Sequence, residues 1–130
     1  MTEIGERLLA RSDAAIEAAQ RAVEADDAET AANRAYYAMF YAASMLLESE
    51  GIAVRRHSAI HAAFGERFVK SGRMDASLHR ALLTAFDLRI LADYDPMTSI
   101  TLDSARRSIE DARSFLATAR SYRPAGDRDQ

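Results

Sequence analysis

The sequence of 130 residues lacks cysteine and contains only two prolines and five glycines. The absence of cysteine excludes disulfide bonds and metal sites built on thiolates. So few turn-forming residues argue against a β-sandwich or β-barrel, which needs many turns. No run approaches the ~20 apolar residues of a membrane span, and the first residues lack the basic start and apolar middle of a signal peptide. We therefore expect a cytoplasmic protein without membrane attachment.

An excess of positive charge is also absent, because the formal net charge at pH 7 is −3. This balance argues against a protein that binds duplex DNA through bulk charge. What is abundant is alanine, arginine, leucine and glutamate, all of which are good helix formers. The length suits one domain with its own core. The composition therefore predicts a small all-α domain.

Apolar residues recur at helical spacing between the glycine and proline breaks. The pattern predicts five helices, over residues 3–24, 28–49, 57–70, 75–93 and 100–121. The short connections between them favour an up-and-down bundle of antiparallel helices. We predict a single domain over residues 1–123 and a disordered polar tail over residues 124–130.

Two of these helices carry more specific information. The helix over 28–49 is apolar around most of its surface, which predicts a central position or burial against a partner chain. The helix over 100–121 has strict three-four spacing of apolar residues, which suits packing along a neighbouring helix. Ser99 or Asp103 is the expected N-cap of this last helix.

The first candidate site lies at the end of the fourth predicted helix. Arg89 falls on the inward stripe of that helix or at its edge, where an unpaired charge is costly. Asp93 lies one turn later and is the nearest candidate partner, which would make the pair a structural ion pair. The alternative is a guanidinium held to meet phosphate, with Tyr94 stacking on a base or donating a hydrogen bond.

The second candidate site lies at the start of the second helix. Asn33, Arg34 and Tyr37 are candidate contacts to RNA or a nucleotide, since Asn33 and Tyr37 share one face beside an apolar surface. Tyr36 and Phe40 share the adjacent face and are expected to belong to the core.

The third candidate site lies between the second and third helices. Arg56 and His57 could contact phosphate there, although an exposed basic turn is the simpler interpretation. His57 and His61 are four residues apart and could share a helix face, but two histidines without a well-spaced carboxylate do not predict a metal site. We expect no metal and no cofactor.

Three segments together resemble the HEPN superfamily. These segments are the run NRAYYAMFYAA over residues 33–43, His57 followed by Phe64 and Phe68, and the pattern Arg89-x-x-x-Asp93-Tyr94. More narrowly, they resemble the small stand-alone prokaryotic HEPN proteins often encoded beside a minimal nucleotidyltransferase. The likeness covers about residues 5–120, which is nearly the whole chain.

The resemblance implies a helical bundle that forms a homodimer and acts on RNA in a toxin–antitoxin or defence-type system. In active members an R-x4-6-H motif from each protomer meets across the dimer interface and cleaves RNA without metal. The arginine would steady the phosphate while the histidine and the attacking ribose hydroxyl handle proton transfer. By this resemblance Arg89, Asp93 and Tyr94 are the candidate catalytic residues, but Tyr94 stands where the motif has histidine. The sequence thus leaves open whether the protein cleaves RNA or only binds it.

Three functions remain in competition. One is an RNA-directed HEPN module, and another is a non-catalytic helical dimer that binds a partner nucleotidyltransferase or a nucleotide. The third is a plain helical scaffold in which the ion pair of Arg89 with Asp93 is purely structural. Replacement of Arg89 by alanine separates them, because only the scaffold predicts a lower melting temperature with binding intact.

Overall fold

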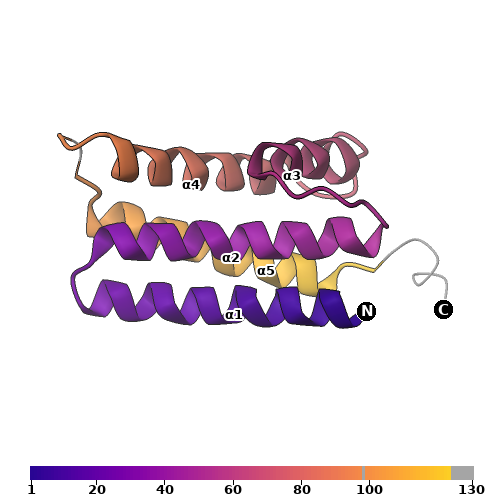
Figure 1. The fold of residues 1–130 in the computed structure, drawn as a ribbon, viewed down its shortest axis with the longest axis horizontal. Helices are drawn as coiled ribbons and strands as arrows, with labels where there is room; N and C mark the ends of the chain where they lie inside the picture. The colour runs from indigo at the N-terminus through magenta and orange to yellow at the C-terminus, as the bar shows by residue number, and fades with distance from the viewer. Residues whose placement is uncertain (98, 124–130) are drawn as a thin grey trace.

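The computed structural model describes residues 1–97 and 99–123, and within them the chain forms five α-helices. These are α1 (Glu3–Glu24), α2 (Ala28–Ser49), α3 (His57–Phe64), α4 (Ala76–Tyr94) and α5 (Leu102–Ser121). The four long helices alternate in direction along the chain (Figure 1), so the predicted up-and-down bundle is confirmed. No helix in these ranges is long and apolar enough to cross a membrane. The predicted tail over 124–130 lies outside the described residues.

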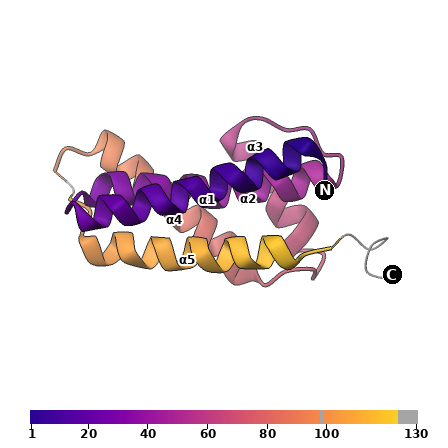
Figure 2. The same cartoon turned by 90° about the horizontal axis from the view of Figure 1, so that it is seen from below.

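Helix α2 is the centre of the bundle, because it packs against all four other helices. Helix α1 lies on one side of it and α3 and α4 lie on the other, while α5 runs behind it and contacts both α1 and α4 (Figures 1 and 2). Small residues such as Ala31, Ala35 and Ala42 are fully buried along α2, which allows its neighbours to approach closely. The prediction of a central second helix is confirmed, and the reason is the apolar surface around most of its circumference.

Side-chain caps begin four of the helices, and each satisfies a backbone N–H that the helix itself leaves without a partner. The capping residues are Thr2, Asp27, Asp75 and Thr101. The cap of α5 differs from the prediction, since Thr101 rather than Ser99 or Asp103 accepts the bond from the N–H of Ser104, at 3.0 Å. Ser99 lies too far before the helix, and Asp103 already lies within its first turn.

The third helix ends earlier than its sequence pattern predicts. The α-helical part stops at Phe64, and the backbone continues as a π-helical turn, η1 (Gly65–Val69). The N–H of Lys70 donates to the carbonyl of Gly65 at 2.8 Å, which is the wide i→i+5 bond of this turn. The imidazole of His79, from α4, presses so closely on Gly65 that a Cβ atom there would lie 2.7 Å from it. The wide turn therefore coincides with a close helix contact that only glycine allows.

Helix α4 is more deeply buried in its first half than in its second half. Leu78, Leu82 and Ala85 are buried against the bundle, as their spacing predicts. No residue of α4 beyond Ala85 is buried, although this second half is rich in apolar side chains. The weakly covered half of α4 is the part that carries Arg89.

Candidate functional site

A buried tyrosine joins two histidines where α2 meets α3. Tyr36 of α2 is completely inaccessible to solvent. Its hydroxyl oxygen lies 2.9 Å from Nδ1 of His57 and 2.8 Å from Nε2 of His61, both on α3. A phenol has a single hydrogen to donate, so it donates to one imidazole and accepts from the other. When both histidines are neutral, one of them therefore carries its proton on the nitrogen that faces Tyr36, and the other carries its proton on the opposite nitrogen.

Aromatic rings enclose this group on several sides. Phe40 stacks on the ring of His57 with centroids 4.4 Å apart, and Phe86 meets the ring of His61 edge-on at 4.8 Å. Such apolar surroundings disfavour charged forms of the groups they enclose. Among the sequence predictions, Tyr36 and Phe40 were expected to be core residues, and Tyr36 has in addition a polar role at its hydroxyl.

Burial and one nearby charge set the protonation of this cluster. Burial raises the pKa of the Tyr36 hydroxyl far above its usual range, and the positive charge of Arg89 opposes that rise. Burial, followed by repulsion from His57 and His79, lowers the pKa of His61 to about 4. Burial and the charge of Arg89 also lower the pKa of His57. Near neutral pH the tyrosine and both histidines are therefore uncharged.

Arg89 reaches the same cluster from α4. Its guanidinium carbon lies 5.6 Å from the ring centroid of Tyr36 and 5.2 Å from that of Tyr37, within the range of cation–π interactions. The predicted ion pair is present but long, since Nε of Arg89 lies 3.9 Å from Oδ2 of Asp93. That separation exceeds a hydrogen bond, and within the described part of the chain the buried Nε has no hydrogen-bond partner. The guanidinium is therefore stabilised mainly by the two tyrosine rings and less by the carboxylate of Asp93.

The remaining residues of the first candidate site point elsewhere. Asp93 keeps about half of its side chain accessible, and Tyr94 is 78% exposed at the end of α4. Five helical residues turn the chain by roughly 140° beyond a full revolution, so Tyr94 lies on a different side of α4 from Arg89. Within one chain, therefore, Arg89 and Tyr94 do not converge on a common point.

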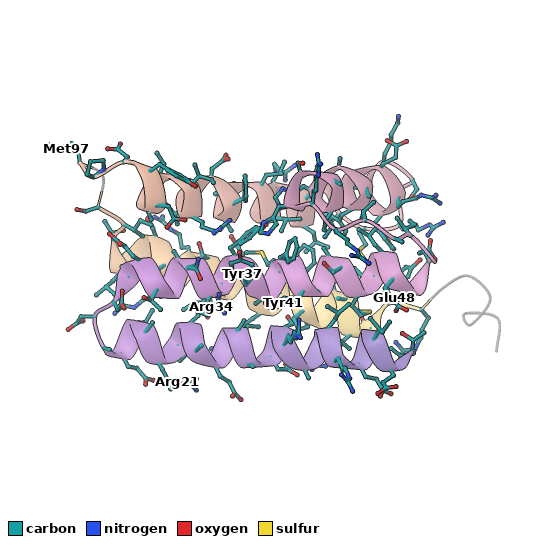
Figure 3. The ribbon with its side chains drawn as sticks, in the orientation of Figure 1. Arg21, Arg34, Tyr37, Tyr41, Glu48 and Met97 are labelled. Carbon is teal, nitrogen blue, oxygen red and sulfur yellow. The ribbon has the colours of Figure 1, made fainter. Side chains whose placement is uncertain are left out.

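The second candidate site adjoins Arg89 through Tyr37. The carbonyl oxygen of the Asn33 side chain accepts hydrogen bonds from Nε and Nη2 of Arg34 at 3.1 and 2.9 Å. The guanidinium carbon of Arg34 lies 4.9 Å from the ring centroid of Tyr37, so Tyr37 is in contact with two arginines. Figure 3 shows Arg34, Tyr37 and Tyr41 following one another along the visible side of α2. The structure brings Asn33, Arg34 and Tyr37 together with Arg89.

The third candidate site is divided by the start of α3. Arg56 is exposed and occupies the position just before the helix, where its backbone is extended and its side chain makes no capping bond. His57, the first residue of the helix, turns inward to Tyr36. His57 thus joins the cluster with Arg89, whereas Arg56 lies at its outer edge. No group of three potential metal ligands occurs within residues 1–97 and 99–123.

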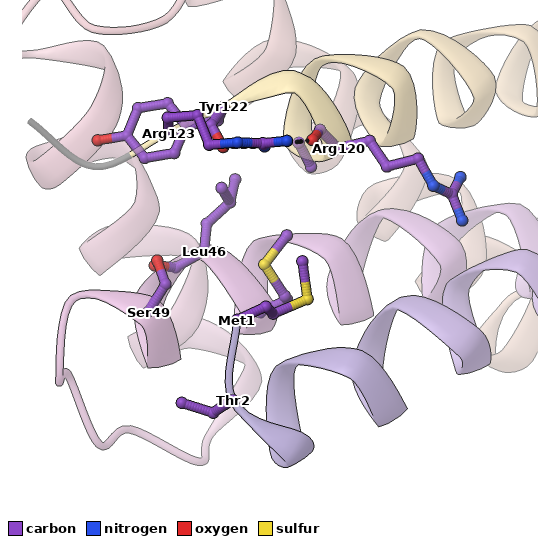
Figure 4. Close-up of a pocket in the computed structure, with 9 residues that line it drawn as sticks. Met1, Thr2, Leu46, Ser49, Arg120, Tyr122 and Arg123 are labelled. Carbon is purple, nitrogen blue, oxygen red and sulfur yellow. Dashed lines mark hydrogen bonds between the residues drawn. The ribbon is translucent and has the colours of Figure 1, made fainter. Parts of the chain in front are cut away.

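A separate pocket of about 400 Å³ lies at the end of the bundle where the chain begins (Figure 4). It is lined by residues from the chain start, α2 and the end of α5, and by none of the predicted site residues. Its cationic side chains already have partners: Arg120 forms an ion pair with Asp13, and Arg123 donates to the carbonyl of Arg120 at 2.8 Å. Among the residues that the structure describes, none that lines this pocket belongs to the cluster around Tyr36.

Sequence reasoning missed the roles of Tyr36, His61 and Phe86 in the site. The spacing of His57 and His61 was a usable signal, because residues four apart on a helix face the same neighbour. What the spacing could not identify was that neighbour, since Tyr36 lies 21 and 25 residues away in the sequence.

The chain matches one family model and several known proteins. Residues 6–122 match the model of the HEPN domain. A protein of Methanocaldococcus jannaschii with the name "Putative toxin" is 27% identical over 117 residues, which are 90% of this chain and 80% of that protein. A UPF0332 protein of Gloeobacter violaceus is 32% identical over 127 residues, covering 90% of this chain and 99% of its own length. A second M. jannaschii protein with the same toxin name is 31% identical over 83 residues, covering 64% of this chain and 61% of its own. The helical bundle, the quoted motifs and these matches agree, and the chain belongs to the HEPN domain family.

Proposed function

We propose that this protein is a toxin-type component of a toxin–antitoxin or defence-type system and that it acts on RNA, with Arg89 contacting a phosphate. The observation that carries the proposal is the state of Arg89. Its charge rests on two aromatic rings, its buried Nε has no hydrogen-bond partner among the described residues, and its one carboxylate neighbour is 3.9 Å away. The side chain keeps 21% of its surface accessible, and a guanidinium without a close carboxylate is suited to phosphate, which accepts two parallel hydrogen bonds from it.

The surroundings of Arg89 suit a nucleic acid better than a free anion. Arg34 adds a second positive charge across the ring of Tyr37. Asn33 and Tyr37 add an amide and an aromatic surface, the two kinds of group that read unpaired bases. The toxin names of two relatives and the family match support the same class of function.

A second copy of the chain is the partner that best completes this site. Beyond Arg89, the end of α4 exposes Leu91 and Tyr94, and the turn after it exposes Met97; these side chains are 45%, 78% and 89% accessible. Adjacent exposed apolar side chains on a small protein mark an interaction surface. A symmetric dimer through this surface brings Leu91 and Tyr94 of both copies together at the end of α4 that carries Arg89.

The proposal is tested by measuring affinity for single-stranded RNA by fluorescence anisotropy. Arg89→Ala should weaken binding about 10-fold or more, since a hydrogen bond to a charged group contributes about 1.5–3 kcal/mol. Arg80→Ala, an exposed arginine on the same helix, is the matched control and should change affinity little. Equal affinity of all three proteins contradicts the phosphate contact. Retained binding with a lower melting temperature for Arg89→Ala would instead identify a structural residue.

Two further measurements address the system and the dimer. Expression of the wild type should arrest growth, and Arg89→Ala should relieve the arrest. Light scattering should give the mass of a dimer for the wild type and of a monomer for Leu91→Glu, which places a charge on the exposed apolar surface. A monomeric wild type contradicts the dimer. Tight co-purification with a nucleotidyltransferase, combined with no effect on RNA, favours the non-catalytic alternative.

A further inference from the structure

The aromatic contacts of Arg89 continue beyond Tyr37 along α2. Tyr41 lies about one turn after Tyr37 on the same helix, and the centroids of the two rings are 5.8 Å apart. Past Tyr41, the guanidinium carbon of Arg11, from α1, lies 6.0 Å from the centroid of the Tyr41 ring. Figure 3 shows the two tyrosines on one side of α2. The contacts form a row that crosses α2 from α4 to α1, in the order Arg89, Tyr37, Tyr41, Arg11.

The positive charges along this row are little neutralised by carboxylates. Arg34 lies over the first ring of the row, and within the described residues neither Arg34 nor Arg11 forms an ion pair. The ion pair of Arg89 is 3.9 Å long. By contrast Arg7, one turn before Arg11 on α1, forms an ion pair with Glu3 at 3.1 Å. Arginines from three helices therefore gather beside two tyrosine rings with most of their charge available to a ligand.

We propose that single-stranded RNA crosses the protein along this arginine–tyrosine track, which consists of Arg11, Arg34, Tyr37, Tyr41 and Arg89. The inference rests on the proposed function and extends it, because it makes the ligand an unpaired strand and carries the site from α4 across α2 to α1. Cations interleaved with aromatic rings suit a single strand, since its phosphates meet the guanidiniums while its unpaired bases stack on the rings. A duplex keeps its bases stacked inside and would use the cations alone.

The far end of the track is accessible to a ligand. Arg11 is exposed and Tyr41 is partly accessible. The ring of Tyr41 packs against the ring of Phe40 with centroids 6.0 Å apart and an angle of 66° between the planes, which holds its orientation. The guanidinium of Arg11 lies at the outer limit of a cation–π contact, so its hold on the ring is weak. The ring is therefore preset for stacking, whereas the cation beside it is free to turn towards a phosphate.

The first test removes the cation at the far end of the track. Fluorescence anisotropy measures the affinity of the full-length protein for a labelled oligouridine over a range of salt concentrations. Arg11→Gln should weaken binding and lower the slope of log affinity against log salt by about 0.7, the value for one phosphate contact on a single strand. Arg21→Gln is the matched control, because Arg21 is an exposed arginine on the side of α1 that faces away from α2 (Figure 3). This control should keep the wild-type slope.

The second test removes the aromatic ring but keeps an apolar side chain. Tyr41→Leu should weaken oligouridine binding about 5-fold or more, the lower end of what one base stacked on an aromatic ring contributes. Tyr41→Phe keeps the ring and should bind as the wild type does. An unchanged melting temperature of Tyr41→Leu excludes unfolding as the cause of the loss. Should this variant unfold, the salt slope of Arg11→Gln decides the proposal, because that side chain is exposed.

Competition experiments test the class of ligand. Unlabelled oligouridine should displace the labelled strand at a lower concentration than either a duplex RNA of equal length or poly-L-glutamate, because only the single strand offers unpaired bases. Equal displacement by the duplex overturns the proposal of a path for single strands. Equal displacement by poly-L-glutamate overturns it too, since it identifies a general anion-binding surface of the kind that an acidic protein partner would use.

The outcomes separate this inference from the proposed function. Weaker binding by Arg89→Ala, combined with wild-type affinity and salt slope for Arg11→Gln and Tyr41→Leu, overturns the track and leaves the phosphate contact standing. The opposite result, in which Arg89→Ala alone binds as the wild type does, contradicts the phosphate contact and places the RNA at Tyr41 and Arg11. A wild type without affinity for oligouridine at low salt contradicts both proposals together.

Discussion

The two sides of α2 differ in whether a buried polar group has a hydrogen-bond partner among the described residues. On the side of α1, the hydroxyl of Ser12 is completely buried and donates to the carbonyl of Ala38 at 2.7 Å. On the side of α3 and α4, the buried Nε of Arg89 has no such partner within the described residues. Folding alone favours the first arrangement, because an unsatisfied buried donor costs stability. The second arrangement is the one on which the proposed phosphate contact of Arg89 rests.

The largest effect should come from the buried face of α5. Ile109→Ala removes a side chain that is 2% exposed on α5, and we expect a loss of about 2–5 kcal/mol in the free energy of unfolding. Urea denaturation measures the loss. Ile4→Ala is the control, since Ile4 is 60% exposed and its truncation should cost about 0.5 kcal/mol or less. Similar losses for both variants would show that this side is less tightly packed than described.

A smaller effect is expected at the contact between η1 and α4. Gly65→Ala places a Cβ atom 2.7 Å from the His79 ring, so either the ring or the wide turn has to move. We expect a loss of about 1–3 kcal/mol in urea denaturation, as for other overpacked sites. Combining Gly65→Ala with His79→Ala should remove most of the penalty, because the clash is then absent. Additive losses in the double variant would place the strain elsewhere.

Acid should weaken the side of α3 and α4 before the other side. His61 has a pKa lowered from 6.5 to about 4, so the unfolded chain binds more protons between these values. Stability should therefore fall as the pH drops from about 6.5 towards 4, and the contribution of His61 to the slope should end below that. Thermal unfolding across this range measures the slope. His61→Gln should flatten it, and an unchanged slope would assign the acid sensitivity to other groups, among them His57, whose pKa is also lowered.

The smallest effects compare the two buried polar groups directly. Ser12→Ala removes a satisfied hydrogen bond and should cost about 1 kcal/mol of the free energy of unfolding. Arg89→Met keeps an unbranched apolar stem in place of the guanidinium, and we expect stability to stay equal or to rise slightly. Urea denaturation at neutral pH measures the change in the free energy of unfolding for both variants. A loss for Arg89→Met that matches or exceeds the loss for Ser12→Ala would make Arg89 part of the scaffold.

The helices were predictable because each depends on local pattern. Apolar spacing located all five, and the nearly continuous apolar surface over 28–49 predicted the central position of α2. The errors concern features that depend on distant contacts. The π-helical turn after Phe64 accompanies the approach of His79 from another helix, and nothing within 57–70 signals it. The cap of α5 was missed because Ser99, Thr101 and Asp103 are all competent caps.

The site was predictable one residue at a time but not as an assembly. The spacing predicts that Arg89 lies on the inward stripe of its helix or at its edge, and in the structure it lies against α2. The sequence could not show that two tyrosine rings would be its closest support, since they lie more than 50 residues earlier in the chain. For the same reason, the sequence could not show that Tyr36 forms hydrogen bonds with the two histidines. The catalytic roles of Asp93 and Tyr94 and the RNA contact of Arg56 stay predictions.

The π-helical turn has a consequence for how this helix can change. An i→i+5 turn holds one residue more than an α-helical turn, so η1 is equivalent to a single inserted residue. Deleting one residue from Gly65–Val69 would restore an ordinary α-helical turn without a large rotation of the chain that follows, because the wide turn accommodates the extra residue locally. If the deleted residue is one of 65–67, Phe68 would follow Phe64 by three residues and not by four, which changes the stacking of two rings whose centroids are 5.6 Å apart. The wide turn thus sets the spacing of the two stacked phenylalanines while the direction of the chain towards α4 is kept.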